Sequence, residues 1–503
     1  MSRDWAVLWL DNPIFVKHFR SRLRGPSLAT ALVITLSLCF CIAWGGFELD
    51  AYRTGGAFGA FYALGAVILG ILGASQVNNS VFSARASGIM DFHRVSPLSP
   101  TELALGFFFG APVREYLLFA CTLPFMLLCV AMGTPDFRGL VQLLIVLLST
   151  SWVLHGLALV TALIFRRPAG PRGARGIVVF LGLVAGNSLT GLGRLANIVD
   201  REPRIDFFGV SLPWLAFLLL YQTPFLLFFF LIACRKLKSE RLHPLSKPQA
   251  ALAMASLSVL LTGAIWNQSQ YKDLAVVLLY VLVILGITLS ALVTPSQAEY
   301  VKGLRRARKL GWPRLSPWHD LALNRIVLLV ICSIVLVTAT IARGQVEGGG
   351  DGASGPIHSP STLAIANGVL VVAYFGLAAQ FFLLRFGRRG SGYFVLFLFL
   401  AWVVPLILGV ITLVGQPGNS GPSQYLFALS PVVGLSLGSG VWMGVGNSLL
   451  GVEAAAITPS LLYTFVFNSL LEGAQRRVQR AVLATAARPN QPAEISGQVE
   501  AAC

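Results

Sequence analysis

Long apolar runs, most of them near twenty residues, recur along this chain from one end to the other, and short polar segments separate them. A helical run of that length crosses the hydrocarbon core of a bilayer. The pattern predicts eleven membrane spans, with at least one more in the apolar region Tyr425–Leu471. The eleven are Ser27–Gly46, Ala57–Ser75, Val113–Gly133, Gly139–Phe165, Gly176–Asn197, Val210–Ala233, Ala251–Trp266, Asp273–Val293, Ile326–Ala342, Thr362–Leu384 and Tyr393–Gly415.

The polar segments divide the chain into parts. The predicted fold is all-α: a polytopic integral membrane protein with about twelve transmembrane helices in two six-helix halves. The parts are the leader 1–26, the first half 27–233 with its loop 76–112, the linker 234–250, the second half 251–471 with its loop 294–325, and the tail 472–503. The halves either descend from a duplication or resemble one another by chance.

The leader predicts an amphipathic helix that starts after Asn12, a good N-cap, with Pro13 at the first helical position. Aromatic and aliphatic side chains fall on one face and basic side chains on another. These are Phe15, Phe19 and Leu23 against Lys17, Arg20 and Arg24. The aromatic face favours an interfacial helix on the membrane surface over a solvated basic leader.

Composition agrees with a membrane protein: 55% of the 503 residues are hydrophobic, 12% are charged, and the mean hydropathy is +0.74. Soluble domains do not have such a composition. The net charge of +17 does not indicate nucleic acid, because Lys and Arg gather in alternate loops between the apolar runs. That is the positive-inside pattern, and it places the amino terminus in the cytoplasm.

Charge also bears on the ambiguous region after residue 420. The tail is basic, so it belongs on the same side as the amino terminus, which requires an even number of crossings. Twelve spans with a re-entrant segment at 421–451 satisfy this, and the many glycines there disfavour a straight helix. The alternative is two spans and a tail on the outside.

Residues for catalysis are few. No lysine follows a glycine as a phosphate-binding P-loop requires, and no His pair has metal-ligand spacing. We therefore expect no catalytic site, no metal site and no cofactor on this chain. His155 is alone in an apolar run, which favours a structural role, with its ring satisfied by an interhelical hydrogen bond, over a functional one. For Glu453 the structural and the functional interpretation both stay open.

The stretch from Val81 to Gly110 carries charged residues between two apolar runs. Within it we expect Ser99 to be the N-cap of a helix, with Pro100 at the first helical position. Glu102 is then the partner of Ser99 in a capping box. Leu98 and Leu103 occupy the hydrophobic staple positions. A weaker copy predicts a second helix start at Ser316 and Pro317, with Asp320 as the nearby acid.

These residues resemble motifs of ATP-binding cassette transporters, in the permeases of the type-2 exporter class. The leader Asn12–Arg24 is similar to the family's amphipathic start, and Arg85–Ile89 with its Gly88 to a segment after its second span. Ser96–Gly106 is similar to a T-P-[LV]-S-x-x-E-[IL]-x-x-G-K motif. The resemblance covers about the first 130 residues, with His18, Ala84, Ile89 and Phe107 departing from the family pattern.

The resemblance implies a permease in a bacterial inner membrane, with both termini cytoplasmic. Separate ATP-binding cassette ATPase subunits would hold ATP and Mg²⁺, so this chain would be no enzyme, and it would move an unidentified substrate, as a homodimer or otherwise. The coupling residues implied are Leu98, Ser99, Pro100, Glu102, Leu103, Arg85 and Gly88, with Ser316, Pro317 and Asp320 in the second half. Alternatives are a non-transporting scaffold or regulatory subunit, or an ion-coupled secondary transporter, for which intramembrane carboxylates are too few.

Overall fold

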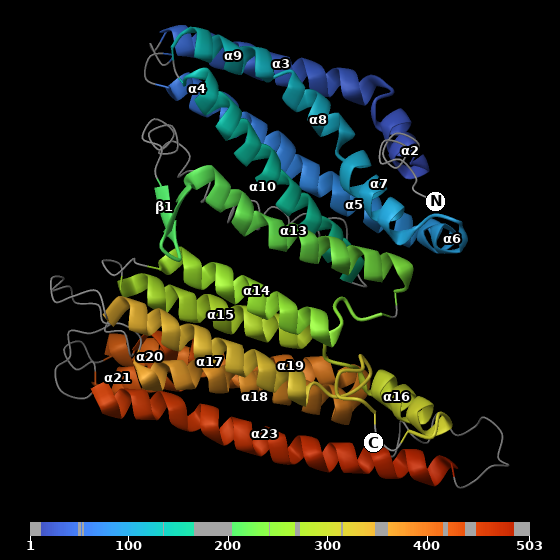
Figure 1. Cartoon of the computed structure of the whole chain (residues 1–503), viewed down its shortest axis with the longest axis vertical. Coiled ribbons are helices and arrows are strands. Elements are labelled where there is room, and N and C mark those ends of the chain that lie inside the picture. Colours follow the sequence, from blue (N-terminus) through green and yellow to red (C-terminus); the bar gives the residue numbers. More distant parts are fainter. Residues whose placement is uncertain are drawn as a thin grey trace. The chain divides into compact units, whose positions relative to one another are not determined.

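The computed structural model describes residues 12–48, 52, 55–133, 135–164, 204–240, 242–266, 272–312, 315–347, 361–415, 421–437 and 449–486. Contacts divide the chain into two compact units, each drawn in Figure 1. Unit 1 comprises Met1–Ile205 and Ser211–Pro244, and unit 2 comprises Asp206–Val210 and Leu245–Cys503.

Eleven helical stretches of the described chain are long and apolar enough to cross a bilayer. This confirms the predicted all-α, multi-pass membrane fold. The stretches are Pro26–Glu48, Gly56–Ala86, Pro100–Ala131, Phe137–Ile164, Trp214–Lys238, Lys247–Ile265, Ala275–Leu292, Arg325–Gln345, Thr362–Phe386, Gly390–Gly415 and Val452–Ala484. The predicted span Gly176–Asn197 lies outside the described residues.

Unit 1 begins with a short helix and continues with longer helical stretches, of which 56–86 and 100–131 are each divided into consecutive elements (Figure 1). The pieces are α2 (Pro13–Arg22), α3 (Pro26–Glu48), α4 (Gly56–Ala66), the π-helix η1 (Val67–Gly73), α5 (Ala74–Ala86), α6 (Ile89–Val95), α7 (Pro100–Gly110), α8 (Val113–Ala120), α9 (Leu123–Ala131), α10 (Phe137–Ile164) and α13 (Trp214–Lys238). The Asn12 side chain caps α2, as predicted, by accepting from the amides of Ile14 and Phe15.

Two predicted spans of unit 1 are longer than the apolar pattern indicated. The span predicted to end at Ser75 continues through α5 to Ala86, because buried polar groups there find partners: Asn78 donates to the Ala158 carbonyl at 3.2 Å. The span predicted to begin at Val113 begins at Pro100. The capped helix is therefore the first part of a membrane-spanning stretch, interrupted near Pro112, which cannot donate a backbone hydrogen bond.

The span predicted from Val210 starts later, at Trp214. Val210–Pro213 is instead strand β2, which pairs with β1 (Arg204–Phe207). Phe208 and Gly209 have positive φ angles of 52° and 80°, as a tight hairpin turn requires. Pro213 then has no amide to contribute to a longer helix and stands at the helix start.

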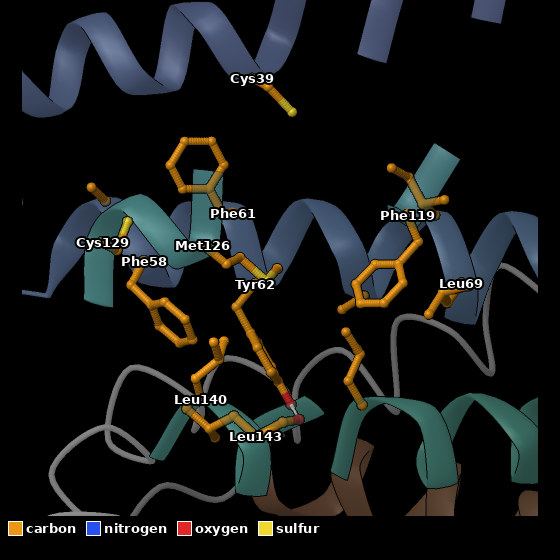
Figure 2. Close-up of a cluster of buried hydrophobic side chains, with 14 of the residues drawn as sticks. Cys39, Phe58, Phe61, Tyr62, Leu69, Phe119, Met126, Cys129, Leu140 and Leu143 are labelled. Atoms are coloured by element: carbon orange, nitrogen blue, oxygen red, sulfur yellow. Dashed lines mark hydrogen bonds between the residues drawn. The ribbon is translucent and has the colours of Figure 1, made fainter. Parts of the chain in front are cut away.

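Two apolar clusters hold unit 1 together. In the first, Figure 2 shows Cys39 on α3, facing the helix that carries Phe61, and Tyr62 reaching toward α10, where its hydroxyl donates to the Leu143 carbonyl at 3.3 Å. The second cluster joins α2, α5, α7, α10 and α13. It contains Ile14, Leu103 and Phe107, each at most 2% exposed. This cluster fixes the short helices relative to the long ones.

Unit 2 is built around one central helix, α18 (Thr362–Phe386), most of whose middle residues are buried. The remaining elements of unit 2 are α14 (Lys247–Ile265), α15 (Lys272–Leu292), α16 (Gln297–Lys309), α17 (Arg325–Glu347), η2 (Gly387–Arg389), α19 (Gly390–Leu398), η3 (Phe399–Val403), α20 (Val404–Gly415), α21 (Gly421–Leu429), α22 (Pro431–Leu437) and α23 (Leu449–Ala486). Figure 1 places α16 at the end of unit 2 where the C-terminal part of α23 lies.

The described part of the predicted re-entrant segment 421–451 consists of α21 and α22, of nine and seven residues, and the start of α23 at Leu449. Each is too short to cross a bilayer alone. They meet at Ser430, whose hydroxyl donates to the Trp402 carbonyl at 2.7 Å. The re-entrant segment stays a prediction, since residues 438–448 lie outside the described chain.

The helix start predicted at Ser316 and Pro317 is wrong. Residues 315–324 form successive turns, and the next helix begins at Arg325. The backbone carbonyls of this segment face a buried ammonium group instead of a helix axis: Lys247 Nζ lies 3.0 Å from the Pro317 oxygen and 2.6 Å from the Ala322 oxygen. Unit 2 instead has capping boxes at Ser246 and Ser296.

Candidate coupling surface on helices α5 to α7

The predicted coupling residues of the first half lie within residues 85–103, where the chain passes from α5 through α6 into α7. We call this segment the α5–α7 turn. The chain leaves α5 at Ala86 and reverses at Gly88, whose φ of 75° is in the left-handed region that favours glycine. It then forms α6 and enters α7 after an extended stretch that ends at Ser99. Gly88 therefore sets the direction of α6, and a side chain there would strain the backbone.

The capping box at the start of α7 is confirmed. The Ser99 hydroxyl accepts from the Glu102 amide at 3.2 Å, and the Glu102 carboxylate accepts from the Ser99 amide at 2.7 Å. Pro100 occupies the first helical position. Leu103 is buried and Leu98 packs on the same cluster, which agrees with the staple positions. Both caps hold the first turn of α7 in a fixed conformation.

Helix α2 is seated on this same turn. Asn12 is 4% exposed, and its amide Nδ2 donates to the Glu102 carbonyl oxygen at 2.7 Å. A methyl group added at Gly106 would lie 2.7 Å from Cβ of Ile14, so glycine is needed for this approach. The face of α2 that carries Ile14 therefore packs against α7, and the Phe19 side chain of α2 is 47% exposed. Its contact with a membrane surface stays a prediction.

Ionic contacts join the turn to the C-terminal end of α13. Arg85 donates to the Ala162 carbonyl at 2.5 Å and to the Glu240 carboxylate at 2.8 Å. Arg94 on α6 pairs with Asp91 at 2.6 Å and reaches the Leu237 carbonyl at 3.3 Å. Cations are favoured beside the last carbonyls of a helix. The sequence placed Arg85 among the coupling residues but not Arg94 or Glu240, whose contacts with one another and with Leu237 and Arg85 join residues more than 140 positions apart.

The outer face of α6 is apolar and exposed. Ile89, Phe92 and Val95 are spaced three residues apart, and their exposed fractions are 38%, 69% and 84%. Residues at this spacing share one side of a helix. We call these three side chains the α6 face. Figure 1 shows α6 at the same end of unit 1 as α2.

The predicted residues of the second half form no matching surface. Ser316, Pro317 and Asp320 lie in the turns that surround the Lys247 ammonium, and Pro317 also lines a cavity of about 570 Å³. Arg325 of α17 and Glu472 of α23 also line this cavity, and their Nη1 and Oε1 atoms are 3.4 Å apart. The structure therefore brings the first-half residues together at the α5–α7 turn. The second-half residues lie in the segment 315–324, whose carbonyls accept hydrogen bonds from Lys247.

Within the described residues, no three His, Cys, Asp or Glu side chains gather as a metal site would need. His155, which the apolar pattern left alone, is fully buried and lies 2.9 Å from the Leu69 carbonyl in η1. This contact agrees with the structural interpretation of that residue.

Comparison with protein-family models, with curated proteins and with solved structures finds no match to this chain. The fold and the α5–α7 turn are thus known from the chain's own geometry.

Proposed function

We propose that this multi-pass membrane protein is the permease subunit of an ATP-driven exporter of the type-2 ATP-binding cassette class. Separate ATPase subunits hold ATP and Mg²⁺, dock on the α6 face from the cytoplasm, and move the spans through α5 and α7. The observation that carries the proposal is the braced α5–α7 turn, which presents an exposed apolar face and continues directly into two membrane-spanning stretches.

The contacts of the turn support force transfer. A load on α6 would pass through Arg94 to the end of α13 and through Arg85 to the end of α10, since these side chains bond to main-chain oxygens of those helices. The capping box and the Asn12 contact keep the start of α7 from unwinding. A surface loop without a partner would need none of these contacts.

The α6 face suits a protein partner of mixed character. Its three apolar side chains stand beside the Asp91–Arg94 ion pair, so a partner would bury an apolar centre with a charged rim. The absence of a P-loop motif from the sequence agrees with a partner that supplies ATP hydrolysis. The transported substrate is unidentified.

The test is capture of the partner from native membranes. A tagged chain should co-purify with a protein that carries a P-loop and hydrolyses ATP. The double variant Phe92→Asp, Val95→Asp should reduce the captured ATPase activity by about tenfold or more, because charge replaces the apolar centre. Leu483→Asp, at a side chain 59% exposed on α23, is the matched control and should leave capture unchanged.

Two results would contradict the proposal. If the unaltered chain captures no ATPase, the scaffold interpretation gains support. If the α6-face variant and the Leu483 variant capture equal ATPase activity, α6 is not the docking helix. Both variants should insert and elute from size exclusion as the unaltered chain does, because the replaced side chains are exposed.

A further inference from the structure

A second cavity lies in unit 1, beside the N-terminal half of α6. It has a volume of about 400 Å³ and lies between α2, α5 and α6, with Phe107 of α7 at one wall. That size lies within the range of small-molecule sites. Ile89 of the α6 face also lines this cavity, whereas Phe92 and Val95, the two residues replaced in the docking test, do not.

Positive charge dominates the cavity lining. Lys17 and Arg22 of α2 contribute permanent cations, and His18 and His93 contribute imidazole rings. Among the described lining residues none is acidic. The Arg22 guanidinium is held in place by a hydrogen bond of 3.1 Å from Nη2 to the Ser80 hydroxyl. The cation is therefore already positioned before any ligand arrives.

Small hydroxyl side chains complete the lining along α5. Ser80, Ser83 and Ser87 recur at helical spacing on the side that faces α2. The Ser87 hydroxyl donates to the Ser83 carbonyl at 2.8 Å, while the exposed Ser83 hydroxyl forms no hydrogen bond within the described chain. Hydroxyl donors beside Lys and Arg are a common combination for phosphate oxygens.

The pKa values of the two histidines are consistent with rings that are buried beside cations. Burial, with Arg22, Lys17 and His93 nearby, lowers the pKa of His18 to about 4. Burial and Lys17 lower the pKa of His93. A bound anion would relieve this repulsion, because opposite charge favours the protonated imidazole.

The position of the cavity suits the headgroup layer of a membrane. Helix α2 ends at Arg22, and the first membrane-spanning helix begins at Pro26. The cavity therefore lies close to the end of a membrane-spanning stretch, and the phosphates of a surrounding bilayer would lie near the ends of such stretches. A soluble phosphate compound could reach the same place from the aqueous side.

We propose that the cavity between α2, α5 and α6 binds the phosphate group of an anionic molecule. Lys17 and Arg22 neutralise its charge, the α5 serines donate hydrogen bonds, and His93 joins the ligand to α6. The phosphate belongs either to an anionic lipid headgroup or to a soluble phosphate compound.

The experiment uses the full chain in two settings. In phosphatidylcholine nanodiscs, inorganic phosphate is titrated and the thermal unfolding midpoint is followed. In detergent, the chain is incubated with an equal mixture of phosphatidylglycerol and phosphatidylcholine, and retained phosphatidylglycerol is counted by native mass spectrometry. A midpoint shift with phosphate identifies a soluble ligand, selective retention identifies a lipid headgroup, and either result supports the cavity.

The variant Lys17→Gln, Arg22→Gln should weaken that binding roughly tenfold or more, because it removes two charge-assisted contacts. Arg20→Gln, Arg24→Gln removes the same charge from exposed positions that do not line the cavity and should retain binding. Ser83→Asp, at an exposed residue of the lining, should abolish binding without affecting folding. Equal weakening in both double variants, or no binding by the unaltered chain, would overturn the proposal.

Discussion

Asn12 and Glu102 are 90 residues apart in sequence and are joined by a hydrogen bond of 2.7 Å from the Asn12 amide to the Glu102 main-chain oxygen. The other atom of the same amide, Oδ1, caps α2 by accepting from the Ile14 amide at 3.0 Å. One buried side chain therefore both starts the leader helix and attaches it to the first turn of α7. The two roles can be separated by substitution.

Asn12→Ser should keep the cap of α2 and lose the link to α7, because serine caps helices well but has no amide to donate. We expect a loss of about 1 kcal/mol in the free energy of unfolding and faster hydrogen exchange in α2. Asn12→Ala removes both contacts and should lose about 1 kcal/mol more. Equal losses in the two variants would show that the cap of α2 contributes nothing.

The capping box of α7 offers a test of the proposed coupling role. Ser99→Ala with Glu102→Ala should lower stability by about 1–2 kcal/mol, because two amides lose their acceptors. It should also reduce the stimulation of the captured ATPase, measured by phosphate release. Ser246→Ala with Gln249→Ala removes an equivalent box from α14 and serves as the control. If both pairs reduce ATPase stimulation equally, the α7 effect is one of stability alone.

Lys247 should be the most sensitive lysine of unit 2. It is fully buried at the start of α14, where a cation opposes the helix dipole, and its ammonium donates to the carbonyls of Pro317, Ala322 and Leu323. Lys247→Met keeps the aliphatic stem but leaves three carbonyls without their donor. We expect a loss of about 2–4 kcal/mol and faster hydrogen exchange in residues 315–324.

Lys309→Met, at an exposed residue of α16, is the control for that substitution and should change stability little. Thermal unfolding in the same detergent compares the two variants. A Lys247→Met protein as stable as the control would mean that water replaces the ammonium at those carbonyls.

Acid should destabilise unit 1 through His18. Its pKa falls from the ordinary value of 6.5 to about 4 on folding, so the unfolded chain binds more protons between these values. Stability should therefore be complete above about pH 6.5 and decline as the pH falls toward 4. The groups near His18 are Lys17 and Arg22 on α2 and His93 on α6, while Arg114 and Glu115 of α8 lie near Arg22.

His18→Gln cannot titrate, so its unfolding midpoint should fall less than that of the unaltered chain between pH 7.5 and pH 5. Occupancy of the α2–α5–α6 cavity by phosphate should also reduce the fall, since the anion favours the protonated ring. A parallel decline in both proteins would assign the acid effect to other groups.

Local signals in the sequence were sufficient where a helix begins with its own cap. Asn12, Ser99 and Glu102 act within a few residues of their position, and the structure confirms both helix starts. The same signal failed at Ser316 because Lys247, about 70 residues away, takes the carbonyls that a helix would use. The free energy of a local helix cap is small compared with the cost of leaving a buried ammonium group without its three acceptors.

Span boundaries were predicted less well than span existence. Apolar composition identified the hydrocarbon part of each helix, but α5 continues through polar residues because Asn78 is satisfied by α10. Contacts of Glu240 with Arg85 and Arg94 were equally invisible, since nothing near Glu240 in sequence indicates its partners. The α5–α7 turn thus depends on local contacts for its helix cap and on long-range contacts for its ion pairs.

The final helix has a mechanical consequence. Helix α23 contains 38 residues, so it is roughly 57 Å long, whereas a hydrocarbon core is about 30 Å thick. Its charged portion from Glu472 onward must therefore project out of the lipid as a stiff lever arm. A sideways displacement of the projecting end by a few ångströms would tilt the membrane-embedded part of α23 in the opposite direction. Pro459, inside the helix, is the position at which α23 can bend.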